Sequence, residues 1–280
     1  MSHELIARLR PVLGRGVLFV VLLLLAGPAL AAGISIGGTG SAIPALRLLA
    51  SDFEAAHPGN AVTIPSSLGT SGGIRAVAAG AIDLSVAARP LTPTEAASGL
   101  QAIPWGRSPF MVVVSPDVTE NGIDFAGLAD ILAGRRVNWG DGTPIIPILR
   151  PPSDTDSLQL AAAAPALAEA LTAAHARPGM VIAVTDQDAA TALTSASGAI
   201  GTQTLLQLIT EGNKVKPLTL AGQKPDLATL SAGRYPLYRD YWIIVGAHPS
   251  SEARALLDYL IGPAVAKRLP SLGMSPASGR

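Results

Sequence analysis

Two short glycine-rich turns carry the groups best suited to holding an anion. Gly37-Gly38-Thr39-Gly40-Ser41 lies between an expected strand and an expected helix, and Gly69-Thr70-Ser71-Gly72-Gly73 lies in the same kind of place. Successive backbone N–H groups at such a junction can bind an anion, helped by the helix dipole. The alternative for the first turn is structural, with Ser41 capping the helix. A dinucleotide fingerprint matches poorly, because Ile43 stands where its third glycine is expected.

A third polar segment, Arg150-Pro151-Pro152-Ser153-Asp154-Thr155-Asp156-Ser157, also separates an expected strand from an expected helix. Arg150 could hold an anion through two parallel hydrogen bonds. One of the small polar side chains is expected to cap the helix, which leaves the others without a structural reason. Asp154 and Asp156 are a weak metal signal, because no third carboxylate or histidine is near. We therefore expect no metal and no cofactor.

The second turn also fits the G-x-S-x-G pattern of serine hydrolases, with Ser71 as the nucleophile. Such an enzyme needs a histidine base, and only His175 and His248 follow Ser71 in the chain. No H-G-G-G oxyanion motif is present. A hydrolase stays an alternative, and we expect that the protein is not an enzyme.

Apolar runs rich in β-branched residues alternate with helical patterns along the chain, which is typical of an α/β fold. The turns would then meet at the carboxyl ends of neighbouring strands, where open α/β sheets bind ligands. We expect two lobes, one formed by residues 32–114 plus 241–280 and the other by residues 115–240, with the ligand between them. The long helical pattern from Leu158 to His175 contains Pro165, which we expect to kink or divide it.

The first 31 residues have the layout of a secretory signal peptide. Three arginines precede the apolar run from Val17 to Ala26, and Ala29-Leu30-Ala31 supplies small residues at the cleavage positions. The chain has no cysteine, so neither a disulfide nor a lipid-modified N-terminus is expected. The 20 lysines and arginines balance the 20 acidic residues, which gives no basic excess for binding nucleic acid. A freely diffusing periplasmic monomer is the expectation.

In their order and character, the three segments resemble the phosphate-binding proteins of bacterial ABC importers, which have the type II periplasmic-binding-protein fold. Residues 38–44 (GTGSAIP) are similar to the first ligand loop of that family, and residues 67–83 (SLGTSGGIRAVAAGAID) resemble the second. Residues 149–157 fall where the family has an arginine followed by a Ser-Gly-Thr loop. The resemblance implies a solute-binding protein that closes two lobes around phosphate or a related small oxyanion and docks on a membrane permease.

The resemblance also implies roles for individual residues. Thr70 matches a serine that donates its hydroxyl to the ligand, and Arg150 matches the ligand arginine. Ala42 matches a ligand threonine, whose hydroxyl is lost here unless Ser41 replaces it, and Ile43 matches a residue used through its backbone N–H. The complete set expected to contact the ligand is Gly40, Ser41, Ala42, Ile43, Thr70, Ser71, Gly72, Arg150, Asp154, Thr155 and Asp156.

Two departures from the family pattern leave the solute open. Ala88 stands where the family has an aspartate that accepts a proton from the bound phosphate, and Arg89 follows it. Asp154 and Asp156 bring two carboxylates into the third loop, and an unpaired buried carboxylate facing a dianion is unfavourable. A periplasmic sensor or adaptor with the same fold is a further alternative to a transport protein.

Overall fold

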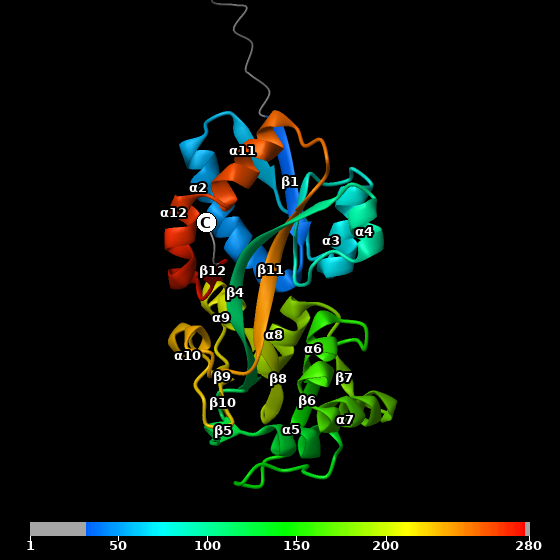
Figure 1. The fold of residues 1–280 in the computed structure, drawn as a ribbon. Coiled ribbons are helices and arrows are strands. Elements are labelled where there is room, and N and C mark those ends of the chain that lie inside the picture. Colours follow the sequence, from blue (N-terminus) through cyan, green and yellow to red (C-terminus); the bar gives the residue numbers. More distant parts are fainter. Residues whose placement is uncertain (1–31, 278–280) are drawn as a thin grey trace, which may run out of the picture.

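The structure is a computed structural model that describes residues 32–277. Figure 1 shows two halves stacked end to end and joined by two long strands, β4 (Gln101–Val114) and β11 (Tyr238–Val245). The upper half contains β1 (Ala32–Gly38), η1 (Gly40–Ala42), α2 (Ile43–Ala56), β2 (Asn60–Thr63), α3 (Gly69–Ala78), β3 (Leu84–Ala87), α4 (Pro93–Ala97), α11 (Ser251–Leu260), α12 (Pro263–Arg268), η2 (Leu269–Leu272) and β12 (Ser275–Pro276).

The lower half is one continuous stretch of chain between the two long strands. It contains β5 (Gly122–Ile123), α5 (Phe125–Leu132), β6 (Ile146–Leu149), α6 (Thr155–Ala163), α7 (Pro165–Ala176), β7 (Val181–Ile182), α8 (Asp186–Ser195), β8 (Ala199–Thr204), α9 (Leu205–Glu211), β9 (Lys216–Pro217), β10 (Thr219–Leu220) and α10 (Leu227–Ser231).

One sheet runs through both halves in the order β2-β1-β3-β11-β4-β8-β6-β7. In the upper half β1 pairs in parallel with β2 and β3, and in the lower half β6 pairs in parallel with β7 and β8. Between them β4 pairs antiparallel with β11 along its first part and with β8 along Phe110–Val114. The carboxyl ends of the parallel strands in each half therefore come close to the junction, and so do the segments that follow them.

Each half has its own hydrophobic core on both faces of its part of the sheet. In the upper half α2 buries Leu46, Leu49 and Phe53 on one face, as its helical spacing predicts, and α3 buries Ile74 and Val77 on the other. In the lower half α5 and α7 cover one face and α8 covers the other. Two α/β layers with separate cores are two lobes, so the predicted fold class is confirmed.

The long strands are shared by the lobes, and the lobe boundaries expected at Val114 and Tyr241 stay a prediction. Along β4 the core changes between Trp105, which packs in the upper cluster, and Phe110, which packs in the lower one. The expected helix from Leu158 to His175 is divided into α6 and α7, because Pro165 has no N–H to continue the first helix and begins the second.

The predicted signal peptide, residues 1–31, lies outside the described residues. Within residues 32–277 no helix combines the length and the apolar character needed to cross a bilayer.

Candidate ligand-binding site

The first predicted turn is buried at the junction of the lobes. Ser41 is only 1% exposed, and its hydroxyl accepts a hydrogen bond of 3.0 Å from the Tyr241 hydroxyl. No side chain caps α2, whose N-terminal neighbour is Ala42, so the alternative that Ser41 caps the helix is wrong. Ala42 and Ile43 pack in the hydrophobic core, which leaves only their backbone groups for a ligand. Gly40 is also buried, at the start of η1.

Tyr241 on β11 connects this turn to the lower lobe. Its hydroxyl also lies 3.2 Å from Thr204 Oγ1, at the end of β8. Burial is the main cause that raises the pKa of Tyr241, to about 12, so the phenol keeps its proton and remains a donor at neutral pH.

The second predicted turn becomes the first turn of α3, and no side chain caps this helix. Thr70 is buried, and its Oγ1 accepts a hydrogen bond of 3.0 Å from the Ala88 N–H, which leaves the hydroxyl proton free to be donated. Ser71 is exposed and accepts a hydrogen bond of 3.2 Å from Nη2 of Arg89. The positive end of the α3 dipole therefore faces the junction with two hydroxyls beside it.

Two glycines allow these turns to lie close together. Gly38 has a φ of +119°, and a side chain there would collide with the carbonyl of Val86. A Cβ on Gly73 would meet the Gly38 Cα at 2.8 Å and the Ser85 side chain even closer. The glycine-rich sequence of both turns thus has a packing reason besides any role in ligand binding.

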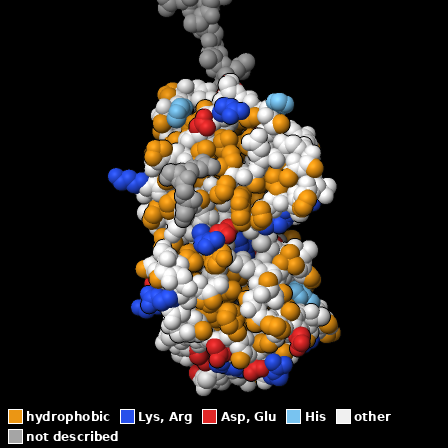
Figure 2. Space-filling model, viewed as in Figure 1, with side chains coloured by type: hydrophobic (Ala, Val, Ile, Leu, Met, Phe, Trp, Pro, Cys, Tyr) orange, Lys and Arg blue, Asp and Glu red, His pale blue; other side chains and the backbone are white. Residues whose placement is uncertain are grey.

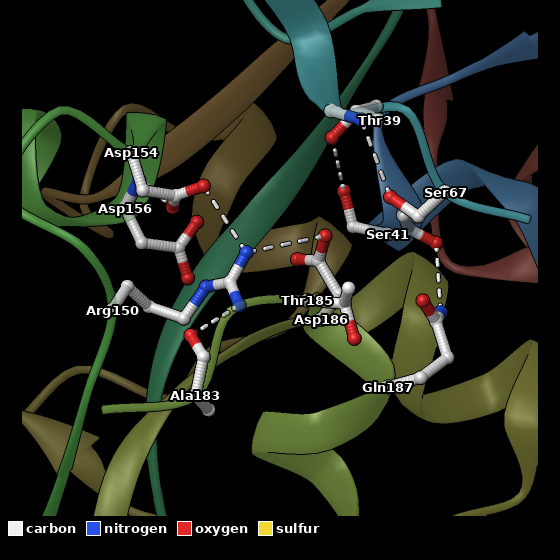
Figure 3. A network of polar contacts seen from close by, with 12 residues as sticks. Thr39, Ser41, Ser67, Arg150, Asp154, Asp156, Ala183, Thr185, Asp186 and Gln187 are labelled. Atoms are coloured by element: carbon white, nitrogen blue, oxygen red, sulfur yellow. Dashed lines mark hydrogen bonds and ion pairs between the residues drawn. The ribbon is translucent and has the colours of Figure 1, made fainter. Parts of the chain in front are cut away.

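In the lower lobe Arg150 follows β6 and is almost completely buried. Its Nη1 donates to the carbonyl of Ala183 at 2.8 Å, and its Nη2 donates to Oδ2 of Asp154 at 3.1 Å. Asp154 also caps α6 by accepting a hydrogen bond from the Asp156 N–H, which confirms the expected capping role for one residue of this segment. Figure 3 shows the guanidinium held between Asp154 on one side and Asp186 on the other.

Asp156 forms a buried ion pair with Arg239 of β11. Its Oδ1 accepts a hydrogen bond of 2.9 Å from Nη2 of Arg239, and its Oδ2 accepts one of 2.8 Å from the Thr202 hydroxyl. Both charged side chains are more than nine-tenths buried. Arg239 further donates to Gln159 and lies over the ring of Phe110. The carboxylate of Asp156, which was expected to repel an anion, is therefore paired with Arg239 of β11.

The N-terminus of α8 touches the first turn of the upper lobe. Gln187 Nε2 donates to the Gly40 carbonyl at 3.0 Å and to Glu211 at 2.7 Å. The Asp186 carboxylate lies 3.7 Å from Nη2 of Arg150 and so close to Gly40 that a Cβ there would collide with it. Burial, followed by the charge of Asp156, raises the pKa of Asp186 to about 7. Burial, again followed by Asp156, also raises the pKa of Asp154.

A groove of about 420 Å³ opens between the lobes. The upper lobe contributes Ser71 and the 88–90 segment, and the lower lobe contributes Ser153, Thr155, Leu158 and Gln159. Residues 238–240 and 242 of β11 line it as well. On the face drawn in Figure 2, charged side chains gather at the waist between the lobes. A larger groove of about 510 Å³ beside β12 is lined by none of the three predicted segments.

The structure thus brings all three segments to one junction but uses their residues unequally. Ser71 and Thr155 line the groove from opposite lobes, and Gly72 is half-buried in α3. Gly40, Arg150 and Asp154 meet around Asp186. The side chains of Ala42 and Ile43 pack in the core, and the carboxylate of Asp156 is paired with Arg239.

Sequence reasoning missed Arg239, Asp186 and Gln187. Arg239 lies shortly before the apolar run Trp242–Val245, and a charged residue beside such a run was one signal that it could be buried and paired. For Asp186 the sequence shows only a helix start, since Thr185 and Asp188 form a capping box around it. Nothing local to that sequence predicts that its carboxylate reaches Arg150.

Comparison with known proteins supports this architecture. The sequence matches the family described as a PBP superfamily domain over residues 26–264. No curated protein matches it significantly.

Solved structures share the fold at low identity. An ABC transporter substrate-binding protein with bound phosphate from Clostridium perfringens has 16% identity and a TM-score of 0.76, with 88% of this chain and 100% of that chain covered. An ABC-type phosphate transport receptor from Vibrio cholerae has 18% identity and a TM-score of 0.63, covering 88% and 100%. The CcmR regulatory domain of Synechocystis, in complex with 2-PG, has 16% identity and a TM-score of 0.55, covering 85% and 99%.

These likenesses show the fold, and the match over residues 26–264 shows the family. The predicted resemblance to the type II periplasmic binding proteins is therefore confirmed: the chain belongs to the PBP superfamily.

Proposed function

We propose that this protein is a periplasmic solute-binding protein of an ABC-type importer that captures a small oxyanion, phosphate or a related ion, between its lobes. The observation that carries the proposal is the convergence of two helix N-termini on one groove from opposite lobes. Ser71 in the first turn of α3 and Thr155 at the start of α6 line the same groove. Free N–H groups at helix starts attract an anion without adding net charge to the site. The start of α3 has no side-chain cap, and at the start of α6 the Asp154 carboxylate accepts from the Asp156 N–H.

The arginine side chains that line the groove are already paired with carboxylates and are not free to attract the solute. Arg89 and Arg239 both line the groove, but Arg89 is paired with Glu95 and Arg239 with Asp156. A solute oxyanion would therefore depend on the hydroxyls of Thr70 and Ser71 and on backbone N–H groups for most of its hydrogen bonds. Binding of this kind needs no covalent step, so the proposed protein is not an enzyme. In the same proposal it is a monomer, and its partner is a membrane permease.

A thermal-shift screen tests this proposal. The ligands are phosphate, sulfate, molybdate, tungstate, phosphonates and small organic acids, each at increasing concentration. Binding to the native state stabilises a protein by about 2.7 kcal/mol at a hundredfold excess over Kd. For a chain of this size that corresponds to a rise in Tm of about 5–11 °C. A screen in which no oxyanion raises Tm would contradict the proposal.

The serine-hydrolase alternative lacks a base at the candidate nucleophile. The Ser71 hydroxyl accepts its hydrogen bond from the guanidinium of Arg89, which cannot take a proton. The two ring nitrogens of His175 lie against the backbone carbonyls of Leu171 and Arg150. A Ser71→Ala variant that still binds the solute, together with a parent that hydrolyses no ester, removes this alternative.

The likeness to the CcmR regulatory domain keeps a sensor or adaptor role as a second candidate. An importer gene next to the gene for this protein favours transport, and its absence favours sensing. The periplasmic location is tested by N-terminal sequencing of the exported protein, which should begin at Ala32 or directly after it.

A further inference from the structure

Asp186 occupies a position in the junction that suits an anion. Its carboxylate faces the guanidinium of Arg150 in the lower lobe (Figure 3). It also lies so close to Gly40 of the upper lobe that a Cβ there would collide with it. The side chain is only 11% exposed. On the next residue, Gln187 donates a hydrogen bond to the Gly40 carbonyl, so the start of α8 is held against the first turn.

The charges around Asp186 do not neutralise it. Arg150 is its nearest partner at 3.7 Å, but the same Nη2 atom is closer to Asp154, at 3.1 Å. Arg239 is more distant and is already paired with Asp156. Two guanidiniums therefore serve three carboxylates, and Arg150 Nε is buried without a partner.

Arg47 of α2 is exposed and shares a groove with Gln187 and Glu211, but it forms no ion pair with Asp186 in the described part of the chain. Tyr241 keeps its proton, since burial raises its pKa. Glu211 of α9 accepts hydrogen bonds from Gln187 and Gln207, and Asp188 binds the Thr185 N–H in the capping box. A second anion brought into this junction would meet an excess of negative charge unless one carboxyl were protonated.

We propose that the Asp186 carboxylate is an internal anion that competes with the solute, and that a solute oxyanion binds together with a proton taken up by this carboxyl. The inference rests on the proposed oxyanion-binding function. A bound oxyanion near Asp186 would raise the pKa of that carboxyl further, because like charges disfavour the ionised form. In this proposal the solute binds when the Asp186 carboxyl is protonated, and binding is opposed when that carboxyl is ionised.

The first arm of the test uses no solute. The pKa of Asp186 in the folded protein is about 7, above the value of about 3.9 in an unfolded chain. The folded state therefore binds the proton more tightly, and stability falls as pH rises from about 4 to about 7. Tm is measured from pH 4.5 to 9 for the wild type, Asp186→Asn and Asp258→Asn. Asp258 is exposed on α11, so this control removes the same charge away from the junction.

In this arm the internal-anion proposal expects Asp186→Asn to be more stable than the wild type above pH 7, with the advantage shrinking toward pH 5. The Asp258→Asn control should follow the wild type throughout. Parallel Tm curves for the wild type and Asp186→Asn would overturn the proposal, because they would mean that Asp186 carries no unfavourable charge.

The second arm measures the affinity for inorganic phosphate by titration calorimetry at pH 6 to 9. At each pH the dissociation constant of the wild type is divided by that of Asp186→Asn. Phosphate itself changes charge in this pH range, and the ratio removes this effect because it is the same for both proteins. With proton uptake required, wild-type affinity falls relative to Asp186→Asn by about tenfold per pH unit above pH 7, approaching about a hundredfold at pH 9. Near pH 6 the two proteins should bind about equally well.

The outcomes separate this inference from the proposed function. If both proteins bind phosphate with a ratio that does not change with pH, competition by Asp186 is overturned and the oxyanion function stands. If Asp186→Asn binds more weakly at every pH, Asp186 is a ligand for the solute and the proposal is again overturned. If neither protein binds phosphate, the competition is overturned together with the phosphate-binding function.

Discussion

The buried pair of Arg239 and Asp156 lends itself to a quantitative test of what holds the junction together. Arg239→Met keeps an unbranched apolar side chain in place of the arginine stem but removes the guanidinium, which pairs with Asp156 and lies over the ring of Phe110. Asp156 then remains buried with only the Thr202 hydroxyl as a side-chain partner. Removing one member of a buried ion pair typically costs about 3–5 kcal/mol, because the other charge is left uncompensated.

For a chain of this size a loss of 3–5 kcal/mol lowers Tm by about 6–20 °C. The assay is thermal and urea unfolding followed by circular dichroism at pH 7. The matched control is Arg135→Met, which breaks the exposed pair with Asp130, where both side chains are about half or more exposed. An exposed pair contributes about 0–1 kcal/mol, so this control should lower Tm by no more than about 4 °C.

A double variant separates the lost pair from lost packing. Arg239→Met combined with Asp156→Leu removes both charges, and apolar replacement of a complete buried pair is often neutral or stabilising. We expect it to recover most of the stability that the single variant loses. The reasoning is refuted if Arg239→Met lowers Tm no more than Arg135→Met does, or if the double variant is less stable than the single one.

Two further predictions concern the lobe contact and the salt bridge at the groove. In Gly40→Ala the new Cβ would collide with Asp186 and approach Gln187 and Ser67, so we expect a wider separation of the lobes in small-angle X-ray scattering and weaker solute binding. Gly33→Ala, whose Cβ meets nothing within 4 Å, should change neither, and an unchanged scattering profile for Gly40→Ala would contradict the prediction. For Glu95, the hydrogen bonds from Arg89 are the main cause that lowers the pKa to about 2. Stability from this pair is present above the unfolded pKa of about 4.3 and is lost as pH falls toward 2. Glu95→Gln should therefore remove part of the loss of Tm between pH 4 and 2, while a curve as steep as that of the wild type would exclude this contribution.

Much of the fold was predictable because its signals are local. The helical spacing of Leu46, Leu49 and Phe53 identified α2, and Pro165 predicted the division between α6 and α7. The glycine-rich turns were recognisable because only glycine tolerates the positive φ of Gly38 and the close contact of Gly73 with it. The apolar run Phe110–Val114 forms only the second part of β4, which begins at Gln101.

The candidate site was predictable only in part. The positions of Ser71, Arg150 and Thr155 followed from turns at strand ends, which a sheet brings together by its topology. The pairing of Asp156 with Arg239 could not be predicted, because the two residues are 83 positions apart and meet only after β11 has crossed between the lobes. The same holds for Ser41, whose hydroxyl is engaged by Tyr241 across 200 positions.

The sequence by itself determined the α/β class, the two glycine-rich strand-to-helix turns, and the arginine at the end of β6. These features depend on neighbouring residues, through backbone conformation and hydrophobic spacing. Only the tertiary structure decided which charges at the junction are neutralised and which are not. Electrostatic energy depends on distance and burial, and both are set by how α6, α8 and β11 pack, so residues far apart in the chain decide what Asp186 and Arg150 can do.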